Sequence, residues 1–350
     1  MLRVTSRKTI TIVGGGLAGL TLGIVLRDQD VPVVIWEAGS YPRHRVCGEF
    51  VNGRGLETLQ RLGLMDGLVR SGAQPAYNAA FYYSDGHRSV RDLPKPAICL
   101  SRYTLDAWLA GRFLRCGGEL RCGARWQGPF CQEGVVCASG RAAQAGQGAW
   151  RWYGLKAHAS HIPLAADLEM HLAPNSYVGL CRLPDGIVNV CGLFRRKTGD
   201  PSLPEDVVAR FSLDRGATLR ERFRRAEWDQ RSMCAVGGLP LRGGMCRKEG
   251  ECHVGDAFAM IPPITGNGMS MAFESAELAW EPLCAYANGR ISWDAACRFV
   301  EKACCRRFAR RLRWAGWLHV GLFQTRFSSW MLSRLGCAPL PWRLLFDRTR

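Results

Sequence analysis

The stretch that decides the fold is TITIVGGGLAGLTLGIVLRDQDVPVVIWE, residues 9–37. A β-branched run over residues 9–13 and another over 31–36 enclose a segment, 16–27, whose apolar residues recur at helical spacing. The order strand, tight turn, helix, strand forms one βαβ unit. It predicts an α/β fold that begins with a Rossmann-like, doubly wound domain.

The turn of this unit carries the motif Gly-x-Gly-x-x-Gly. Its first glycine permits a tight turn, its second leaves room for a pyrophosphate at the positive end of a helix, and its third permits close helix packing. An acidic residue at the end of the second strand can accept a ribose hydroxyl. We therefore expect a dinucleotide here, contacted by Gly14, Gly16, Leu17, Ala18, Gly19 and Glu37.

A second motif, VGDAFAMIPPITGNGM at residues 254–269, distinguishes FAD from NAD. It resembles the second flavin-binding motif of the superfamily that contains the aromatic hydroxylases (group A flavin monooxygenases) and the geranylgeranyl reductases. That resemblance implies that Asp256 holds the ribityl chain of FAD, while the helix that starts near Gly268 directs its positive end at the flavin. The FAD contacts that it implies are Gly255, Asp256, Pro263, Gly266, Asn267, Gly268 and Met269.

Two further segments carry the same resemblance. RHRVCGEF, residues 43–50, is similar to the Cys-Gly-Glu segment of the geranylgeranyl reductase branch, and LSRYTLD, residues 100–106, to the Arg-x-x-Leu-Asp helix start of the family. The resemblance makes Cys47 and Glu49 the candidate catalytic residues, in contact with flavin or substrate. An inert buried thiol is the alternative for Cys47. The resemblance also assigns FAD contacts to Arg43, Arg45 and Arg102.

The chain departs from family patterns at two places. Ala138-Ser139-Gly140-Arg141 stands where many relatives have an Asp-Gly motif that contacts flavin and pyridine nucleotide. The Trp-x-Trp-x-Ile-Pro signature of tryptophan halogenases is also missing, because Trp150-Arg151-Trp152 continues with Tyr153-Gly154. NADPH or NADH is therefore an inferred reductant, and a halogenase is disfavoured.

The length of 350 residues and a hydrophobic content of 47% predict a folded chain of about two domains, and exclude a disordered or collagen-like protein. Alternating sequence and turn signals from residue 150 indicate a β-rich layer. We expect a discontinuous FAD-binding domain (1–75, 97–149 and 250–290), an inserted antiparallel β-sheet substrate domain (76–96 and 150–249) and a helical C-terminal region (291–350).

No metal site is expected. The 16 cysteines include no Cys-x-x-Cys pair, and many lie in apolar stretches, which favours buried thiols in a reducing, cytoplasmic compartment. His158, His161 and His171 lie in the β-rich part, where positions three apart on a strand point to opposite faces. Lys156 is expected to be solvated, and the alternative is that it faces the substrate.

The net charge of +17 leaves a charge-dependent partner open. Residues 292–335 predict an amphipathic basic helix with arginines at 306, 307, 310 and 313. This helix could rest on a membrane, meet an acidic carrier protein, or pack on the core and solvate its arginines. No nucleic-acid motif accompanies the charge, so no nucleic acid is expected as a partner.

The motifs together predict an FAD-dependent oxidoreductase that acts on a small hydrophobic biosynthetic intermediate. NAD(P)H-dependent monooxygenation is the favoured chemistry, and reduction of carbon–carbon double bonds is the alternative. A non-enzymatic basic binding protein on the same fold is a remote third possibility. Either redox reaction requires a pocket that excludes water.

Overall fold

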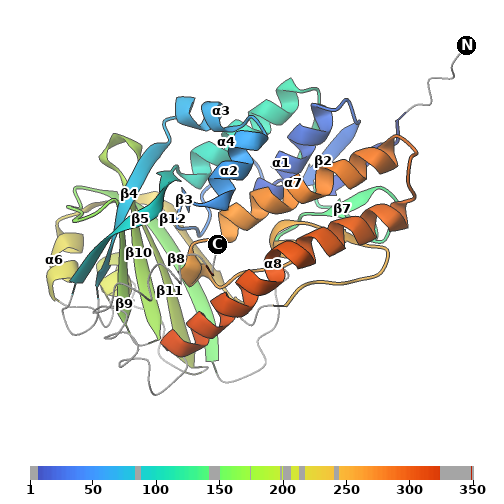
Figure 1. The fold of residues 1–350 in the computed structure, drawn as a ribbon. Helices are drawn as coiled ribbons and strands as arrows, with labels where there is room; N and C mark the ends of the chain where they lie inside the picture. The colour runs from blue at the N-terminus through green and yellow to red at the C-terminus, as the bar shows by residue number, and fades with distance from the viewer. Residues whose placement is uncertain are drawn as a thin grey trace, which may run out of the picture.

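The computed structural model describes residues 7–82, 88–141, 150–173, 175–197, 206–212, 217–239 and 244–323, with the single positions 199 and 348. Two sheets lie toward opposite ends of the molecule, and a long C-terminal helix runs alongside both (Figure 1). The Rossmann-like domain, the inserted β layer and the helical C-terminal region expected from the sequence are confirmed within these residues.

The first sheet is parallel, and its strands follow the order β13-β7-β1-β2-β6. Ile12 pairs with Ile35 on one side and with Val136 on the other, and all three side chains are fully buried. Short β-branched runs therefore form its central strands, as is typical of buried parallel sheets. The strands are β1 (Ile10–Val13), β2 (Val33–Glu37), β6 (Glu119–Cys122), β7 (Val135–Cys137) and β13 (Cys252–His253).

Helices from distant parts of the chain pack together beside this sheet. The helix that follows β1 contacts two later helices, and side chains such as Leu20, Phe113 and Phe273 form one continuous buried cluster with the strands. This cluster fixes the ends of the helices relative to the strands. The helices are α1 (Leu17–Arg27), α2 (Arg54–Arg61), α3 (Met65–Arg70), α4 (Arg102–Arg115) and α7 (Gly268–Ala287).

The second sheet follows the order β12-β8-β11-β10-β9-β4-β5-β3, with antiparallel neighbours except the parallel pair β4 and β9. Its strands come from both expected β segments and from the FAD-binding segments that flank the first of them. They are β3 (Phe50–Val51), β4 (Gln74–Tyr82), β5 (Arg88–Cys99), β8 (Trp150–Ser160), β9 (Leu168–Ala173), β10 (Ser176–Arg182), β11 (Val188–Lys197) and β12 (Glu227–Gly237).

The two faces of this sheet have different neighbours. Val178 and Val190 pack with residues of α5 (Val207–Ser212) and α6 (Ala217–Arg224) on one face. Alternate residues point to the other face, toward the FAD-binding part. The strand register aligns a row across that face, which runs Met170, Gly179, Cys191, Lys156 and Cys234.

The C-terminal helix α8 (Trp293–Phe323) connects the two halves. It packs on α7, where the guanidinium of Arg311 lies 2.6 Å from the buried carboxylate of Glu274. At its end, Leu322 and Phe323 join an apolar cluster with Trp152 of β8. No helix in the described residues combines the length and the apolar character that crossing a membrane requires.

Candidate active site

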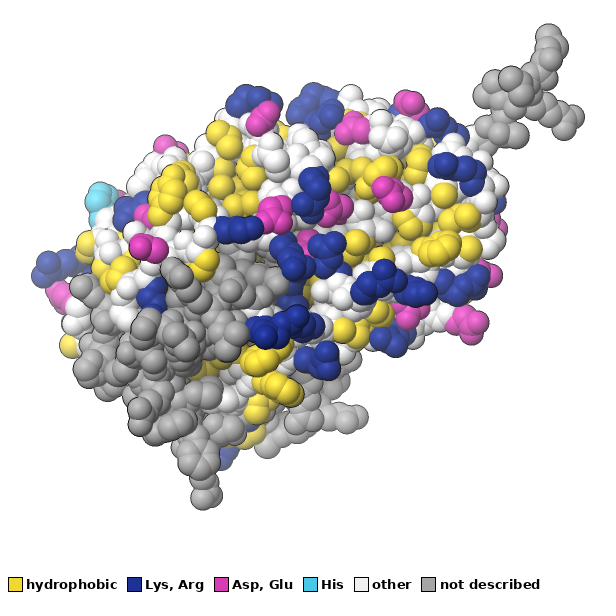
Figure 2. All heavy atoms as spheres, in the orientation of Figure 1, with side chains coloured by type: hydrophobic (Ala, Val, Ile, Leu, Met, Phe, Trp, Pro, Cys, Tyr) yellow, Lys and Arg dark blue, Asp and Glu magenta, His cyan; other side chains and the backbone are white. Residues whose placement is uncertain are grey.

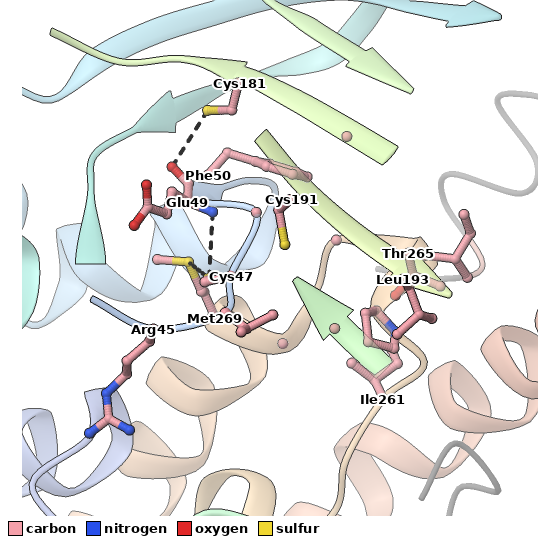
Figure 3. A pocket seen from close by; sticks show the side chains of 18 of the residues that line it. Arg45, Cys47, Glu49, Phe50, Cys181, Cys191, Leu193, Ile261, Thr265 and Met269 are labelled. Atoms are coloured by element: carbon pink, nitrogen blue, oxygen red, sulfur yellow. Dashed lines mark hydrogen bonds between the residues drawn. The ribbon is translucent and has the colours of Figure 1, made fainter. Parts of the chain in front are cut away.

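A cavity of about 590 Å³ lies between the FAD-binding part and the second sheet. One wall consists of the start of α1, the loop at 44–50, the loop at 254–266 and the start of α7. The opposite wall consists of side chains from β4, β5 and the strands β8 to β12. Figure 3 shows Cys47 and Met269 on the first wall and Cys191 and Leu193 on the second.

The glycines of the first motif have separate structural roles. A Cβ atom added to Gly14 would lie 2.3 Å from the carbonyl oxygen of Ala138, and one added to Gly19 would lie 2.0 Å from that of Gly14. A Cβ on Gly16 would meet no atom within 4 Å. Gly16 caps α1 without a side-chain hydrogen bond. The helix end thus faces open space, which fits a bound pyrophosphate.

Glu37 is held by the backbone of the same turn. Its carboxylate accepts hydrogen bonds from the N–H groups of Gly15 (2.9 Å) and Gly39 (2.8 Å), and Nη2 of Arg43 lies 2.7 Å away. Burial alone would raise the pKa of Glu37, but the hydrogen bond and charge of Arg43 outweigh it and lower that pKa. Arg43 therefore supports Glu37. Arg45 lies 3.7 Å from Glu37 and 3.1 Å from Asp106, and it also lines the cavity.

The second motif presents another helix end to the cavity. Gly266 has a φ of 64°, and the backbone then enters α7, where a Cβ on Gly268 would meet no atom within 4 Å. Asn267 caps α7 without a side-chain hydrogen bond to it. Asp256 is open to the cavity, and desolvation raises its pKa against the opposing charges of Arg102 and Arg141. Two helix ends thus face one cavity without a side-chain hydrogen bond from their capping residues, and this arrangement fits FAD.

Glu49 belongs to a buried ionic network at the cavity wall. Its Oε2 lies 2.6 Å from Nε2 of His158, and its Oε1 lies 3.4 Å from Nζ of Lys156 and accepts a 2.8 Å hydrogen bond from the backbone N–H of Arg102. Burial would raise the pKa of Glu49, but the hydrogen bond with His158 and the charge of Lys156 lower it. Glu49 is therefore a carboxylate that holds the loop at 44–50 against the second sheet.

Lys156 was expected to be solvated, and this expectation is wrong. The side chain is fully buried, because β8 directs it toward Glu49 on the inner face of the sheet. Its Nζ also lies 2.9 Å from Nδ1 of His44. The partly exposed His44 has its pKa lowered to about 4, first by burial and then by the charge of Lys156.

One group of possible metal ligands occurs in the described residues. His44, His158 and Asp229 place one ligand atom each within 4.8 Å of one another. The ammonium group of Lys156 beside His44 disfavours a second cation there. His171 lies elsewhere, paired with Glu169 at 2.9 Å, and His161 follows the end of β8.

Cys47 meets the cavity as a protonated thiol. Its Sγ lies 3.3 Å from Sδ of Met269, and the side chain of Asn189 donates a 3.0 Å hydrogen bond to its carbonyl oxygen. Desolvation raises the pKa of this thiol. The side chain is thus packed against the first residues of α7 and is a poor nucleophile.

The second sheet supplies a mostly apolar wall. Tyr177, Cys181, Cys191 and Leu193 point into the cavity from β10 and β11 (Figure 3 labels the last three). Burial raises the pKa values of both thiols and of the Tyr177 hydroxyl, so all three remain neutral. Leu318 and Leu322 of α8 extend this wall.

Most residues assigned to FAD from the sequence lie on the cavity wall together with both candidate catalytic residues. Five do not line it. Gly14 and Gly19 shape the turn, Glu37 and Arg43 pair with each other behind it, and Asn267 is buried at the start of α7. The lining residues from those assignments are Gly16, Leu17, Ala18, Arg45, Cys47, Glu49, Arg102, Gly255, Asp256, Pro263, Gly266, Gly268 and Met269.

Several lining residues were not singled out from the sequence. Alternation along residues 176–194 could have divided the side chains of β10 and β11 between the two faces of the sheet. It could not have shown which of these faces lines the cavity. Nothing in the sequence identified His44 as a lining residue except its place in the Cys-Gly-Glu segment. The missed residues include His44, Arg141, Tyr177, Cys181, Cys191, Leu193 and Cys234.

Comparisons with known proteins agree with this site. A family described as FAD binding domain matches residues 7–144. Squalene epoxidase of Schizosaccharomyces pombe is 29% identical over 92 residues, 26% of this chain and 20% of that protein. Digeranylgeranylglycerophospholipid reductase 2 of Methanothermobacter thermautotrophicus is 31% identical over 122 residues, 34% of this chain and 29% of that protein. The matches thus span under a third of either relative.

Solved structures share the fold over nearly the whole chain. PqsL of Pseudomonas aeruginosa, described as a probable FAD-dependent monooxygenase, superimposes with a TM-score of 0.69 at 16% identity, covering 93% of this chain and 100% of that one. The halogenase PltM gives a TM-score of 0.72 at 15% identity, with coverages of 95% and 83%. These structures share the fold of this chain, and the family match shows that residues 7–144 contain an FAD-binding domain, as the sequence motifs indicated.

Proposed function

We propose that this chain, which carries an FAD-binding domain on the fold of flavin-dependent monooxygenases and halogenases, is an FAD-dependent oxidoreductase that oxygenates an apolar substrate. The observation that carries the proposal is the shared cavity. It extends from Gly16, at the start of α1, to Cys191 and Leu193 on the second sheet. A cofactor and a substrate can therefore meet in one enclosed space.

The residues of the chain would hold FAD from its pyrophosphate to its flavin ring. The start of α1 and Arg45 would bind the pyrophosphate, Asp256 the ribityl chain and the start of α7 the flavin ring. When bound, FAD supplies the two-electron redox chemistry, and NADPH or NADH is the proposed reductant. The positive end of α7 would stabilise the negative charge of the reduced ring.

The opposite wall would position the substrate and exclude water. Its neutral side chains offer Tyr177 and several thiols but little charge, which suits a hydrocarbon-like molecule. The carboxylate of Glu49 is tied to Lys156 and His158, so it contributes a fixed charge beside the cavity. This arrangement supports chemistry that depends on flavin and exclusion of water more than on an acid or base of the protein.

Double-bond reduction is the second candidate. The placement of Cys47 and Glu49 at the cavity favours it, because these residues carry the resemblance to geranylgeranyl reductases. The names of these two relatives refer to squalene and to a digeranylgeranyl lipid, which are both long isoprenoids. Squalene and a geranylgeranyl phospholipid are therefore the first substrate probes.

The test incubates the FAD-loaded protein with NADPH and each probe, with and without oxygen. Oxygenation predicts oxygen uptake that matches product formation, with an atom of labelled oxygen in the product. Anaerobic formation of a saturated product would instead support the reductase and contradict the oxygenase.

A pair of variants separates the substrate wall from the cofactor wall. Cys191→Phe should fill the sheet side of the cavity, abolish turnover and leave FAD content unchanged. Cys122→Phe, at an exposed edge of the parallel sheet, is the control, and both its turnover and its FAD content should match those of the original protein. Full activity of Cys191→Phe would contradict the assignment of the substrate wall.

A further inference from the structure

One face of α8 carries an exposed stripe that the site does not use. Seven side chains recur at intervals of three or four residues, so they follow one line along the helix for about 30 Å. Figure 2 shows lysine and arginine side chains gathered along this helix, with hydrophobic side chains among them. The α8 stripe consists of Phe299, Lys302, Arg306, Arg310, Arg313, Trp317 and Val320.

The stripe is cationic in its middle and apolar at its ends. Phe299 is 55% exposed at one end, and Trp317 and Val320 are 69% and 45% exposed at the other. The four cations between them form no ion pair with any carboxylate of the described residues, and the stripe itself contains no acidic residue. The arginines on the packed side differ, because Arg307 and Arg311 both pair with Glu274.

We propose that the α8 stripe lies on the surface of an anionic lipid bilayer. Cations along a straight helix attract anionic headgroups, while aromatic side chains at its ends enter the boundary between headgroups and acyl chains. Among the described residues, the stripe itself has four unpaired cations and no carboxylate, although Glu277 and Glu281 of α7 line a pocket beside Lys302 and Arg306. Its excess of positive charge is complementary to such headgroups.

The position of the stripe connects this surface to the cavity. Leu318 and Leu322, in the last turns of α8, line the cavity, whereas Trp317 and Val320 in the same turns are exposed. A bilayer in contact with the stripe would therefore lie beside the sheet wall of the cavity. An apolar substrate dissolved in that bilayer would have a short path to the site.

The direct test is sedimentation of the FAD-loaded protein with vesicles of phosphatidylglycerol mixed with phosphatidylcholine, against vesicles of phosphatidylcholine alone. We expect binding to the anionic vesicles only, weakened by added salt. The triple variant Arg306→Gln, Arg310→Gln, Arg313→Gln should lower the partition coefficient about 100-fold, since each cation contributes about fivefold. Trp317→Ala should lower it about tenfold at unchanged charge.

A second triple variant is the matched control. Arg220→Gln, Arg224→Gln and Arg225→Gln remove the same charge from exposed positions at α6, on another side of the molecule (Figure 1). We expect this variant to bind nearly as well as the original protein. Equal losses in both triple variants would overturn the proposal, because total charge would then account for binding. Failure of the unmodified protein to bind anionic vesicles would overturn it too, and would leave an acidic protein as the partner to seek.

Thermal unfolding and FAD content show whether each variant is still folded. All substituted side chains are exposed, so thermal unfolding and FAD content should match those of the original protein. A protein that binds vesicles but retains no FAD would contradict the proposed function and leave the docking surface intact.

Discussion

Gly14 and Gly16 are two residues apart in one turn, but a side chain at each would meet different surroundings. A Cβ on Gly14 would collide with the backbone of Ala138, and the φ of 113° there is unfavourable for any other residue. A Cβ on Gly16 would enter open space in front of α1. The first glycine is therefore required by the fold, and the second leaves open the space where we propose that the pyrophosphate binds.

Gly16→Ala should thus separate binding from folding. We expect the thermal midpoint of the FAD-free protein to stay unchanged, whereas the dissociation constant of FAD should rise by about tenfold or more because the methyl group occupies the pyrophosphate position. Gly316→Ala, where a Cβ on α8 also meets no atom within 4 Å, is the control and should bind FAD normally. Normal FAD affinity of Gly16→Ala would place the pyrophosphate elsewhere.

Glu49 and Lys156 depend on each other because both side chains are fully buried. Lys156→Met would leave the carboxylate of Glu49 without its cation, and such a loss costs about 3 to 5 kcal/mol of unfolding free energy. The double variant Glu49→Gln, Lys156→Met should recover part of that loss, since no charge is then left unpaired. Urea unfolding measures both values. A double variant less stable than Lys156→Met would contradict this account of the pair.

At the scale of elements, the last turns of α8 bring an uncharged histidine into an aromatic cluster. His319 is buried between Trp152 and Phe323, and neither of its ring nitrogens has a hydrogen-bond partner among the described residues. Burial, followed by the charge of Arg195, lowers its pKa to about 4. The folded protein therefore resists protonation at a site that the unfolded chain protonates near pH 6.5.

This difference makes stability depend on pH. Between pH 6.5 and 4 the unfolded state binds a proton that the folded state does not, so stability falls as the pH is lowered through this window. His319→Phe should remove about 3 kcal/mol of the loss. Chemical unfolding at several pH values measures this. Part of the slope should remain in His319→Phe, because the pKa of His44 is also lowered to about 4. A slope as steep as that of the original protein would show that His319 is protonated when folded.

The elements also show what the sequence could and could not predict. The glycine turn and the 254–269 segment were predictable because each forms its helix end from consecutive residues. The burial of Lys156 was not, because it depends on Glu49, which comes from a distant segment and meets β8 only in the folded sheet. The side of the second sheet that meets the flavin was also undetermined, since alternation defines two faces without naming their neighbours.

At the scale of the whole molecule, the site arises between two layers that each have their own core. The FAD-binding part contributes two helix ends, the second sheet contributes a mostly apolar wall, and α8 packs on α7 and reaches that wall with its last turns. The cavity therefore requires all three parts of the chain. Its position explains how motifs far apart in the sequence, at Gly16 and Gly268, come to line one cavity.

The most direct test of the central claim is the visible absorption spectrum of the purified protein, reconstituted with FAD and then treated with NADPH without oxygen. The account predicts a flavin spectrum with one FAD per chain, released on denaturation and identified by chromatography, and bleaching by NADPH. Flavin that is retained but not bleached would contradict NADPH as its direct reductant. A protein that retains no flavin after reconstitution would contradict the account itself.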